Sequence, residues 1–246
     1  PSHPELLDWL ARRFMEGGWS TKELHRLILT SNVYQMASSN SDHTLAEADP
    51  ENRLLWKFRL QRLEAEQIRD SILAVSGRLN TELGGKTIPL RNRQFVFNHT
   101  SVDHTKYDSL RRSLYLPVIR NNVYSLFSQF DFPDPTMPTG SRNATIVAPQ
   151  ALLMMNSDLV MDSADHLAAL LMSESLDNSR RINVAYERAF GRLPSPSESK
   201  RSLAFISELT SAALADAASV DANAEQSAWS IFCQSLFASN EFIYLR

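Results

Sequence analysis

The feature that most constrains this fold is a central stretch that cannot be helical, set between two long regions with helical periodicity. Between Arg111 and Asn156 the chain carries the segment FDFPDP, in which Pro133 and Pro135 fix the backbone φ angle and remove hydrogen-bond donors. On both sides of it, apolar residues recur at three- and four-residue intervals, which is the spacing of one helix face. The sequence therefore predicts a helical body around an irregular centre.

Helix start signals recur along the chain and predict about nine helices. A serine followed three residues later by a glutamate, the capping-box pattern, occurs at Ser2, Ser20 and Ser195. The sequence Asp49-Pro50-Glu51 is a further start signal for a helix. Pro149 opens a helix after the centre, and Thr145 is the candidate for its N-cap.

Stop signals and apolar faces complete the helical prediction. A helix over residues 63–75 is expected to end at Gly77, and a helix over 180–190 at Gly191. The segment 32–48 is rich in Ser, Asn and Asp, which predicts a loop. The last helix has an apolar face that we expect to be buried in the core, formed by Trp229, Phe232, Cys233, Leu236 and Phe237.

Two short runs are predicted to be strands that pair with each other. They are the alternating segment 94–97 and the apolar segment 113–119. A chain of 246 residues can bury a sizeable core without disulfides or metals. The predicted fold class is therefore mainly α: one irregular multi-helix domain over residues 1–246, with a small β element and an irregular central segment.

Composition excludes several classes of function. From Lys86 to Arg120 there are seven basic and two acidic residues, a net charge of +5, whereas residues 151–246 have seven basic and twelve acidic residues, a net charge of −5. The middle of the chain can attract anions, but duplex-binding proteins are more basic, so no nucleic-acid partner is predicted. No run approaches 18 apolar residues, so no membrane span is predicted. Cys233 is the only cysteine, which excludes an intrachain disulfide and a CxxCH haem motif.

The central stretch supplies one candidate polar site. Arginine side chains bind carboxylate, sulfate or phosphate through two parallel hydrogen bonds, and the stretch combines arginines with proline-framed aspartates. An anion or sugar site would use Arg112, Arg120, Asp131, Asp134, Arg142 and Asn143. The alternative is that the arginines and aspartates pair with each other and hold the irregular segment against the helices.

Three further polar groups are weaker candidates. His99, Asp103, His104 and Asp108 are metal-ligand types, but their spacing matches no metal motif, so no metal site is predicted. Glu64 and Glu66 point to different sides of a helix, so we interpret them as a solvated face or ion-pair partners of Arg62 and Arg69. In an extended segment, Arg111 and Arg112 point to opposite sides, so one of them is expected to face inward.

Eight segments occur in order along nearly the whole chain: PSHPELLDWLA, LHRLILTSNVYQ, DPENRLLW, RLEAEQIRDSILAVSG, RRSLYLPV, FDFPDP, VAPQALLMMNS and ASNEFIY. Together they resemble the C-terminal domain of unknown function of planctomycete-type exported proteins. In those proteins it follows a planctomycete cytochrome-c-like domain and a second domain of unknown function. The resemblance implies an exported protein, periplasmic or surface-associated, with haem in another domain of the parent. The family pattern begins before Pro1, so we expect an N-terminally truncated fragment.

Two functions remain open from the sequence. The first is an accessory module without catalytic activity that docks partner domains of the parent protein or an anionic polysaccharide. The second is an enzyme domain that acts on extracellular carbohydrate and passes electrons to the cytochrome domain. An open pocket that holds the central carboxylates and arginines would favour the enzyme, whereas mutual pairing of these residues would favour the module.

Overall fold

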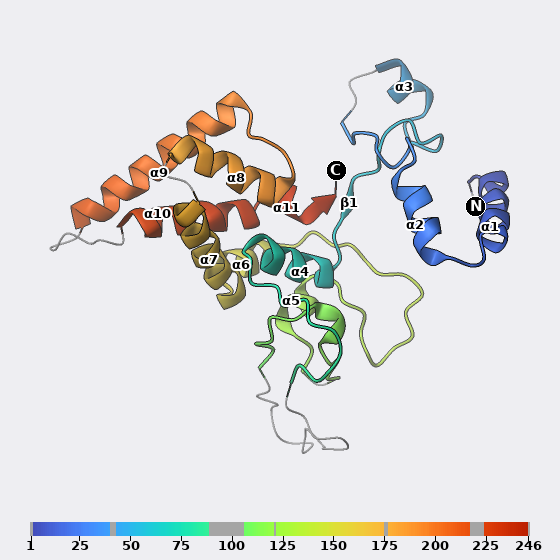
Figure 1. Cartoon of the computed structure of the whole chain (residues 1–246), viewed down its shortest axis with the longest axis horizontal. Helices are drawn as coiled ribbons and strands as arrows, with labels where there is room; N and C mark the ends of the chain where they lie inside the picture. The colour runs from blue at the N-terminus through green and yellow to red at the C-terminus, as the bar shows by residue number, and fades with distance from the viewer. Residues whose placement is uncertain are drawn as a thin grey trace. The chain divides into compact units, whose positions relative to one another are not determined.

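The computed structural model describes residues 2–39, 43–88, 106–120, 122–174, 177–216 and 224–245 (Figure 1). Within these ranges the chain forms eleven α-helices and one sheet of two strands, which confirms the mainly α prediction. In chain order the elements are α1 (Pro4–Glu16), α2 (Thr21–Leu29), α3 (His43–Ala48), β1 (Gln61–Arg62), α4 (Ala65–Val75), the 3-10 helix η1 (Ser113–Tyr115), α5 (Ser125–Gln129), α6 (Ala148–Asn156), α7 (Asp158–Glu174), α8 (Asn178–Phe190), α9 (Pro196–Asp216), α10 (Ala224–Phe237), α11 (Asn240–Ile243) and β2 (Tyr244–Leu245).

The contacts of the chain divide it into two compact units. The smaller unit consists of Pro1–Gln61 with Tyr244–Arg246, and the larger unit is Arg62–Ile243. The expectation that residues 1–246 form one domain stays a prediction.

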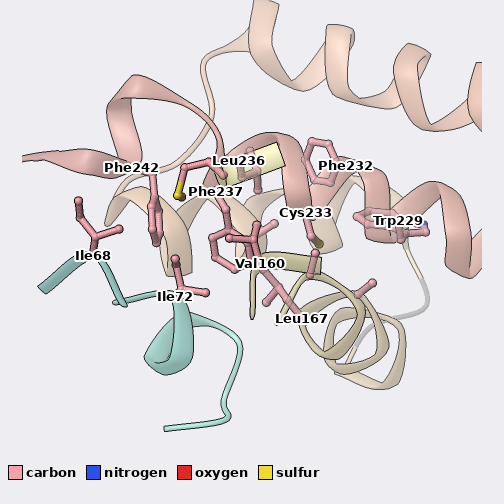
Figure 2. Packing of buried hydrophobic residues seen from close by; sticks show 14 of the residues in the cluster. Ile68, Ile72, Val160, Leu167, Trp229, Phe232, Cys233, Leu236, Phe237 and Phe242 are labelled. Atoms are coloured by element: carbon pink, nitrogen blue, oxygen red, sulfur yellow. The ribbon is translucent and has the colours of Figure 1, made fainter. Parts of the chain in front are cut away.

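The larger unit contains the hydrophobic core. Helix α10 packs against α7 and α9, and the cluster extends to α4 and α8. Figure 2 shows side chains from α4, α7 and α10 in this cluster. Trp229 and Phe237 have no exposed surface and Phe232 is 3% exposed, so the predicted burial of the last helix is confirmed.

The smaller unit is built from short amphipathic helices. Ser20 caps α2 by accepting a hydrogen bond from the backbone N–H of Glu23 at 3.3 Å, as the capping box predicts. The same prediction is wrong at Ser2, because the N-cap of α1 is His3 and no side chain caps it. Helix α3 lies inside the segment 32–48, for which the sequence predicted only a loop.

The helix predicted from Asp49 does not form. The Asp49 carboxylate accepts hydrogen bonds from the backbone N–H groups of Arg53 and Leu54, at 2.9 and 2.7 Å. These bonds favour a turn over a helix, and Asn52 and Leu55 have positive φ angles of 54° and 58° that a helix excludes.

The strand prediction is wrong where the structure can test it. Segment 113–119 forms η1 followed by an irregular stretch, and the sheet pairs β1 with β2 instead. The predicted partner strand, 94–97, lies outside the described residues. The physical reason is that Ser113 donates to the carboxylate of Asp70 on α4 instead of to a neighbouring strand.

Helix ends in the larger unit follow the sequence more closely than those in the smaller unit. Gly77 and Gly191 end their helices with positive φ angles of 75° and 69°, which only glycine adopts without strain. Ser195 and Glu198 form the predicted capping box at the start of α9. Thr145 does not cap α6, whose N-cap is Val147, because its hydroxyl group bonds to Asp131.

Candidate functional site

Helix α4 is the element that binds polar groups of the central segment, through Arg69, Asp70 and Glu66. Its start is fixed by a hydrogen bond from the Glu64 backbone N–H to the Gln67 side chain, at 2.9 Å. One face of the helix is fully buried through Ala65, Ile68 and Ile72. The remaining faces therefore present its charged side chains to two clefts and to the irregular central segment.

Arg69 lies at the centre of a buried polar network. Its side chain is 1% exposed, and one nitrogen donates to the backbone oxygen of Arg111 at 2.8 Å. A second nitrogen donates to the backbone oxygen of Ser109. Burial lowers the pKa of Arg69 from its usual range, because the charged form loses solvation. This role of Arg69 was not predicted from the sequence, although Arg69 stands beside the buried residue Ile68.

The neighbouring Asp70 fixes η1 to α4. Its carboxylate accepts hydrogen bonds from the backbone N–H of Ser113 at 2.8 Å and from the Ser113 hydroxyl at 2.6 Å. Because Ser113 is 4% exposed, these bonds form largely out of water. Arg69 and Asp70 together hold residues 109–113 in place through side chains instead of sheet hydrogen bonds.

Asp131, a predicted site residue, has a structural role. Arg62 donates to its carboxylate at 2.7 Å, and Thr145 donates through its backbone N–H at 2.9 Å and its hydroxyl at 2.8 Å. Partial burial acts to raise the pKa of Asp131, but these hydrogen bonds lower the pKa below its usual value. Asp131 has a φ angle of 59°, which aspartate tolerates better than most residues. The expected pairing of Asp131 with Arg112, Arg120 or Arg142 is wrong, because Arg62 is its partner.

Arg142 is also paired, but with α4. Its two terminal nitrogens donate to the Glu66 carboxylate at 2.6 and 2.9 Å, and one of them lies 3.1 Å from Glu64. The guanidinium group lies over the Phe132 ring at 5.4 Å. The hydrogen bonds to Glu66 raise the pKa of Arg142. Glu64 and Glu66 are therefore ion-pair partners as predicted, but of Arg142 instead of Arg62 and Arg69.

The other predicted site residues lie at the surface. Asp134 accepts hydrogen bonds from the backbone N–H and hydroxyl of Thr136, at 2.8 and 2.6 Å, and these bonds lower its pKa. The other three predicted site residues, Arg112, Arg120 and Asn143, are exposed, and within the described part of the chain they have no ion pair or side-chain hydrogen bond. Arg111 is the inward member of its pair with Arg112, as predicted, at 9% exposure.

The first of the two clefts, the α4 cleft, has a volume of about 650 Å³. Three carboxylates line it, those of Glu64, Glu66 and Asp70, together with Arg112. Its other wall is apolar, and Leu114 and Val118 are 81% and 52% exposed there. Of the six predicted site residues, Arg112 lines this cleft and Arg142 borders it through its glutamate partners.

The second cleft, the polar cleft, has a volume of about 670 Å³ and was not predicted. Its lining includes Arg78, Lys106, Tyr107, Asp108, Tyr124 and Asp158. Arg78 is loosely held, at 3.3 Å from the Ser163 hydroxyl and 3.7 Å from Asp162. Burial raises the pKa of Tyr124.

Three residues of the polar cleft keep their hydrogen-bonding groups available. Lys106, Asp108 and Asp158 are exposed, and among the described residues none of them has an ion pair or a side-chain hydrogen bond. The sequence contains little indication of this cleft, because Lys106 and Asp108 lie about fifty positions before Asp158. The cleft therefore offers both donors and acceptors to a polar ligand.

The part of the chain that the structure describes forms neither a metal-binding cluster nor a membrane span. There, no group of three or more His, Cys, Asp or Glu residues is arranged to hold a metal ion. Of the metal-ligand types singled out above, only Asp108 is described, and His99, Asp103 and His104 lie outside the described residues. Within the same ranges, every helix is too short or too polar to cross a lipid bilayer.

Comparison with known proteins gives the family. No curated protein and no solved structure matches the chain. One family model matches residues 1–206, which include α4, both clefts and all six predicted site residues. The chain therefore belongs to the PSD1 family, described as protein of unknown function (DUF1553).

Proposed function

We propose that this chain is a binding module without catalytic activity and that its ligand is an anionic glycan. The observation that carries the proposal is that Asp131 and Arg142 already have protein partners, Arg62 and Glu66. Buried or half-buried charges that pair in this way hold a structure together and are not available for a reaction. Among the described residues, Lys106, Asp108 and Asp158 have no such partner, and all three line the polar cleft.

The polar cleft supplies both kinds of contact that an anionic sugar needs. Asp108 and Asp158 can accept hydrogen bonds from sugar hydroxyl groups, and Lys106 can bind a sulfate or carboxylate substituent. Arg78 adds a second cation whose present contacts, at 3.3 and 3.7 Å, are long enough to be exchanged for a ligand. A volume of about 670 Å³ lies in the usual range of ligand sites.

A second binding role is supported by the α4 cleft. Leu114 and Val118 are exposed apolar side chains beside the carboxylates of Glu64 and Asp70. Exposed apolar surface rimmed by charge is typical of protein contacts. We propose that a partner domain of the same parent protein docks there.

The enzyme alternative has less support. Glu66 and Asp70 lie one helical turn apart and both line the α4 cleft. However, Arg142 and Ser113 already donate to these two carboxylates. An enzyme acting on extracellular carbohydrate would need at least one of these two carboxylates to be free to contact the substrate.

The wider setting rests on the resemblance noted from the sequence. We propose that the module belongs to an exported protein, periplasmic or on the cell surface, of planctomycete type. A cytochrome-c-like domain elsewhere in that protein would hold the haem, and this chain would hold no cofactor of its own.

Calorimetric titration of the chain with a sulfated oligosaccharide and its desulfated counterpart tests the glycan proposal. We expect the sulfated sugar to bind, with an affinity that falls as salt is added. Lys106→Gln and Asp158→Asn should each weaken binding. Lys200→Gln, an exposed lysine of α9, is the matched control and should leave it unchanged.

Three outcomes would overturn the proposal. They are no binding of the sulfated sugar, equal binding of both sugars, and equal loss in the control variant. Shorter products in a chromatogram of the incubated oligosaccharide would show that the chain is an enzyme instead.

A further inference from the structure

The larger unit contains a further cleft, the α9 cleft, between α8, α9 and α10 (Figure 1). Its volume is about 570 Å³, within the usual range of ligand sites. On α9 it is lined by Arg201, Ser202 and Phe205, since residues three and four positions apart lie on the same face of a helix. None of the described residues that line it also lines the polar cleft or the α4 cleft, so it is a separate candidate site.

One wall of the α9 cleft is aromatic. Tyr186 and Phe190 of α8, Phe205 of α9 and Phe232 of α10 all line it. Tyr186 and Phe232 are 7% and 3% exposed, whereas Phe205 is 38% exposed. Aromatic side chains bind other rings in stacked or edge-to-face arrangements, which add to the benefit of apolar contact. This wall therefore favours a ligand that carries an aromatic ring.

The two carboxylates that line the α9 cleft are already bound within the protein. Arg192 donates to Glu198 at 2.8 and 2.9 Å, and to Glu241 at 2.7 and 2.8 Å. Each pair is bidentate, and bidentate hydrogen bonds between charged groups are strong. A cationic ligand would have to displace Arg192 from both carboxylates, so the cleft disfavours a cation.

Two donors of the α9 cleft have no partner within the described part of the chain. Arg201 is exposed and forms no ion pair or side-chain hydrogen bond there. Ser202 is 6% exposed, and its hydroxyl group lacks a hydrogen-bond partner but keeps some accessible surface. Buried hydroxyl groups are usually hydrogen-bonded. By contrast, Ser235 and Ser239 donate to backbone oxygens three positions earlier, both at 2.7 Å. Arg201 and Ser202 together suit an acid group.

We propose that the α9 cleft binds a small aromatic carboxylic acid, with its carboxylate on Arg201 and Ser202 and its ring against Phe205. Arg201 and Ser202 precede Phe205 by about one helical turn, which is roughly 5 Å along the helix axis. A ring and a carboxylate joined by two methylene groups span a similar distance. The simplest probe of this chemistry is therefore 3-phenylpropionate.

Titration of the chain with 3-phenylpropionate, followed by saturation-transfer nuclear magnetic resonance, tests the proposal. A ligand of this size should bind with a Kd in the millimolar range or below. The uncharged 3-phenylpropionamide and the cationic 3-phenylpropylamine should bind at least about tenfold more weakly, because they lack the negative charge that Arg201 contacts. Butyrate keeps the carboxylate but has no ring, and it should bind at least about tenfold more weakly as well.

Variants on α9 locate the site. Arg201→Gln and Ser202→Ala should each weaken binding of 3-phenylpropionate by about fivefold to tenfold, because each removes a donor to the carboxylate. Lys200→Gln and Ser211→Ala remove the same charge and the same hydroxyl group at exposed positions of the same helix, and they should leave binding unchanged. Ser202→Ala should not lower the melting temperature, because the hydroxyl group that it removes has no partner in the described part of the chain.

Three outcomes would overturn the proposal: no binding of 3-phenylpropionate, equal binding of the acid and its amide, and an equal loss in the matched control variants. Circular dichroism of each variant, expected to match that of the parent chain, separates loss of contact from loss of fold. Lys106→Gln, which weakens the polar cleft, should leave binding of 3-phenylpropionate unchanged, so the α9 cleft and the glycan site are tested independently.

Discussion

At the scale of single residues, the predicted site residue Asp131 is held by an arginine outside the predicted site. Arg62, which the sequence analysis treated as an ion-pair partner of glutamates, is 5% exposed and binds Asp131 and the backbone oxygens of Phe130 and Thr145. Arg62 therefore donates hydrogen bonds to several acceptors of the central segment, in which Pro133 and Pro135 prevent a helix. Arg120, in contrast, is exposed.

Replacing Arg62 tests this assignment. Arg62→Met keeps the apolar stem but leaves the Asp131 carboxylate half-buried without its cation. The free energy of unfolding should fall by roughly 2–4 kcal/mol, the range for loss of one partner of a charged hydrogen bond. Arg120→Met is the control and should change the free energy of unfolding by less than about 0.5 kcal/mol. Equal effects of the two variants in urea denaturation would contradict the assignment.

The pH dependence of stability should depend on Glu198. Hydrogen bonds from Arg192, at 2.8 and 2.9 Å, lower the pKa of Glu198 from its usual 4.5 to about 2. A depressed folded-state pKa stabilises the fold fully above pH 4.5, and this contribution is lost as pH falls toward 2. The Glu198 side chain is 21% exposed, so solvent screens part of its interaction with Arg192. We expect the remaining contribution to the free energy of unfolding to be about 2 kcal/mol.

Denaturation at pH 5 and pH 3 measures this contribution. The parent chain should lose more stability between the two pH values than Glu198→Gln, which has no carboxylate to protonate. A variant whose stability falls as steeply as that of the parent would show that other carboxylates govern acid unfolding.

At the scale of elements, η1 depends on a contact from α4. Asp70→Ala removes the acceptor for both Ser113 groups, so the free energy of unfolding should fall by about 1–3 kcal/mol. Hydrogen exchange of the backbone N–H of Ser113 should accelerate, because that group loses its partner. Ser71→Ala, on the same helix, is the control and should leave this exchange rate unchanged.

The contact between Asp70 and Ser113 shows why some elements can be predicted from the sequence and others cannot. The helices ended by Gly77 and Gly191 and the buried face of α10 were predicted because their signals are local. Segment 113–119 has the composition of a strand, but its conformation is decided by Asp70, more than forty positions earlier. The partners of Asp131 and Arg142 were not predicted for the same reason, because Arg62 and Glu66 lie on distant segments of the chain.

At the scale of the whole molecule, the buried apolar side chains of the core lie in the larger unit. Phe232 is 3% exposed and packs edge-to-face on Trp229, with ring centroids 5.6 Å apart. Phe232→Ala should lower the free energy of unfolding by about 3–5 kcal/mol, since it leaves a cavity between helices. Ile231→Ala removes a neighbouring side chain that is 43% exposed, and it should cost much less in the same denaturant titration.

The unequal burial of the two units should separate their unfolding transitions. Helices α1 and α2 bury no residue, whereas the larger unit contains the core, so the smaller unit should unfold at a lower urea concentration. Tryptophan fluorescence can distinguish the units, because Trp9, Trp19 and Trp56 lie in the smaller one and Trp229 in the larger. In Trp229→Phe, fluorescence should report only the early transition, while far-ultraviolet circular dichroism still detects the later loss of the larger unit's helices. One shared transition for both signals would instead show that residues 1–246 unfold as a single cooperative domain, as the sequence alone predicts.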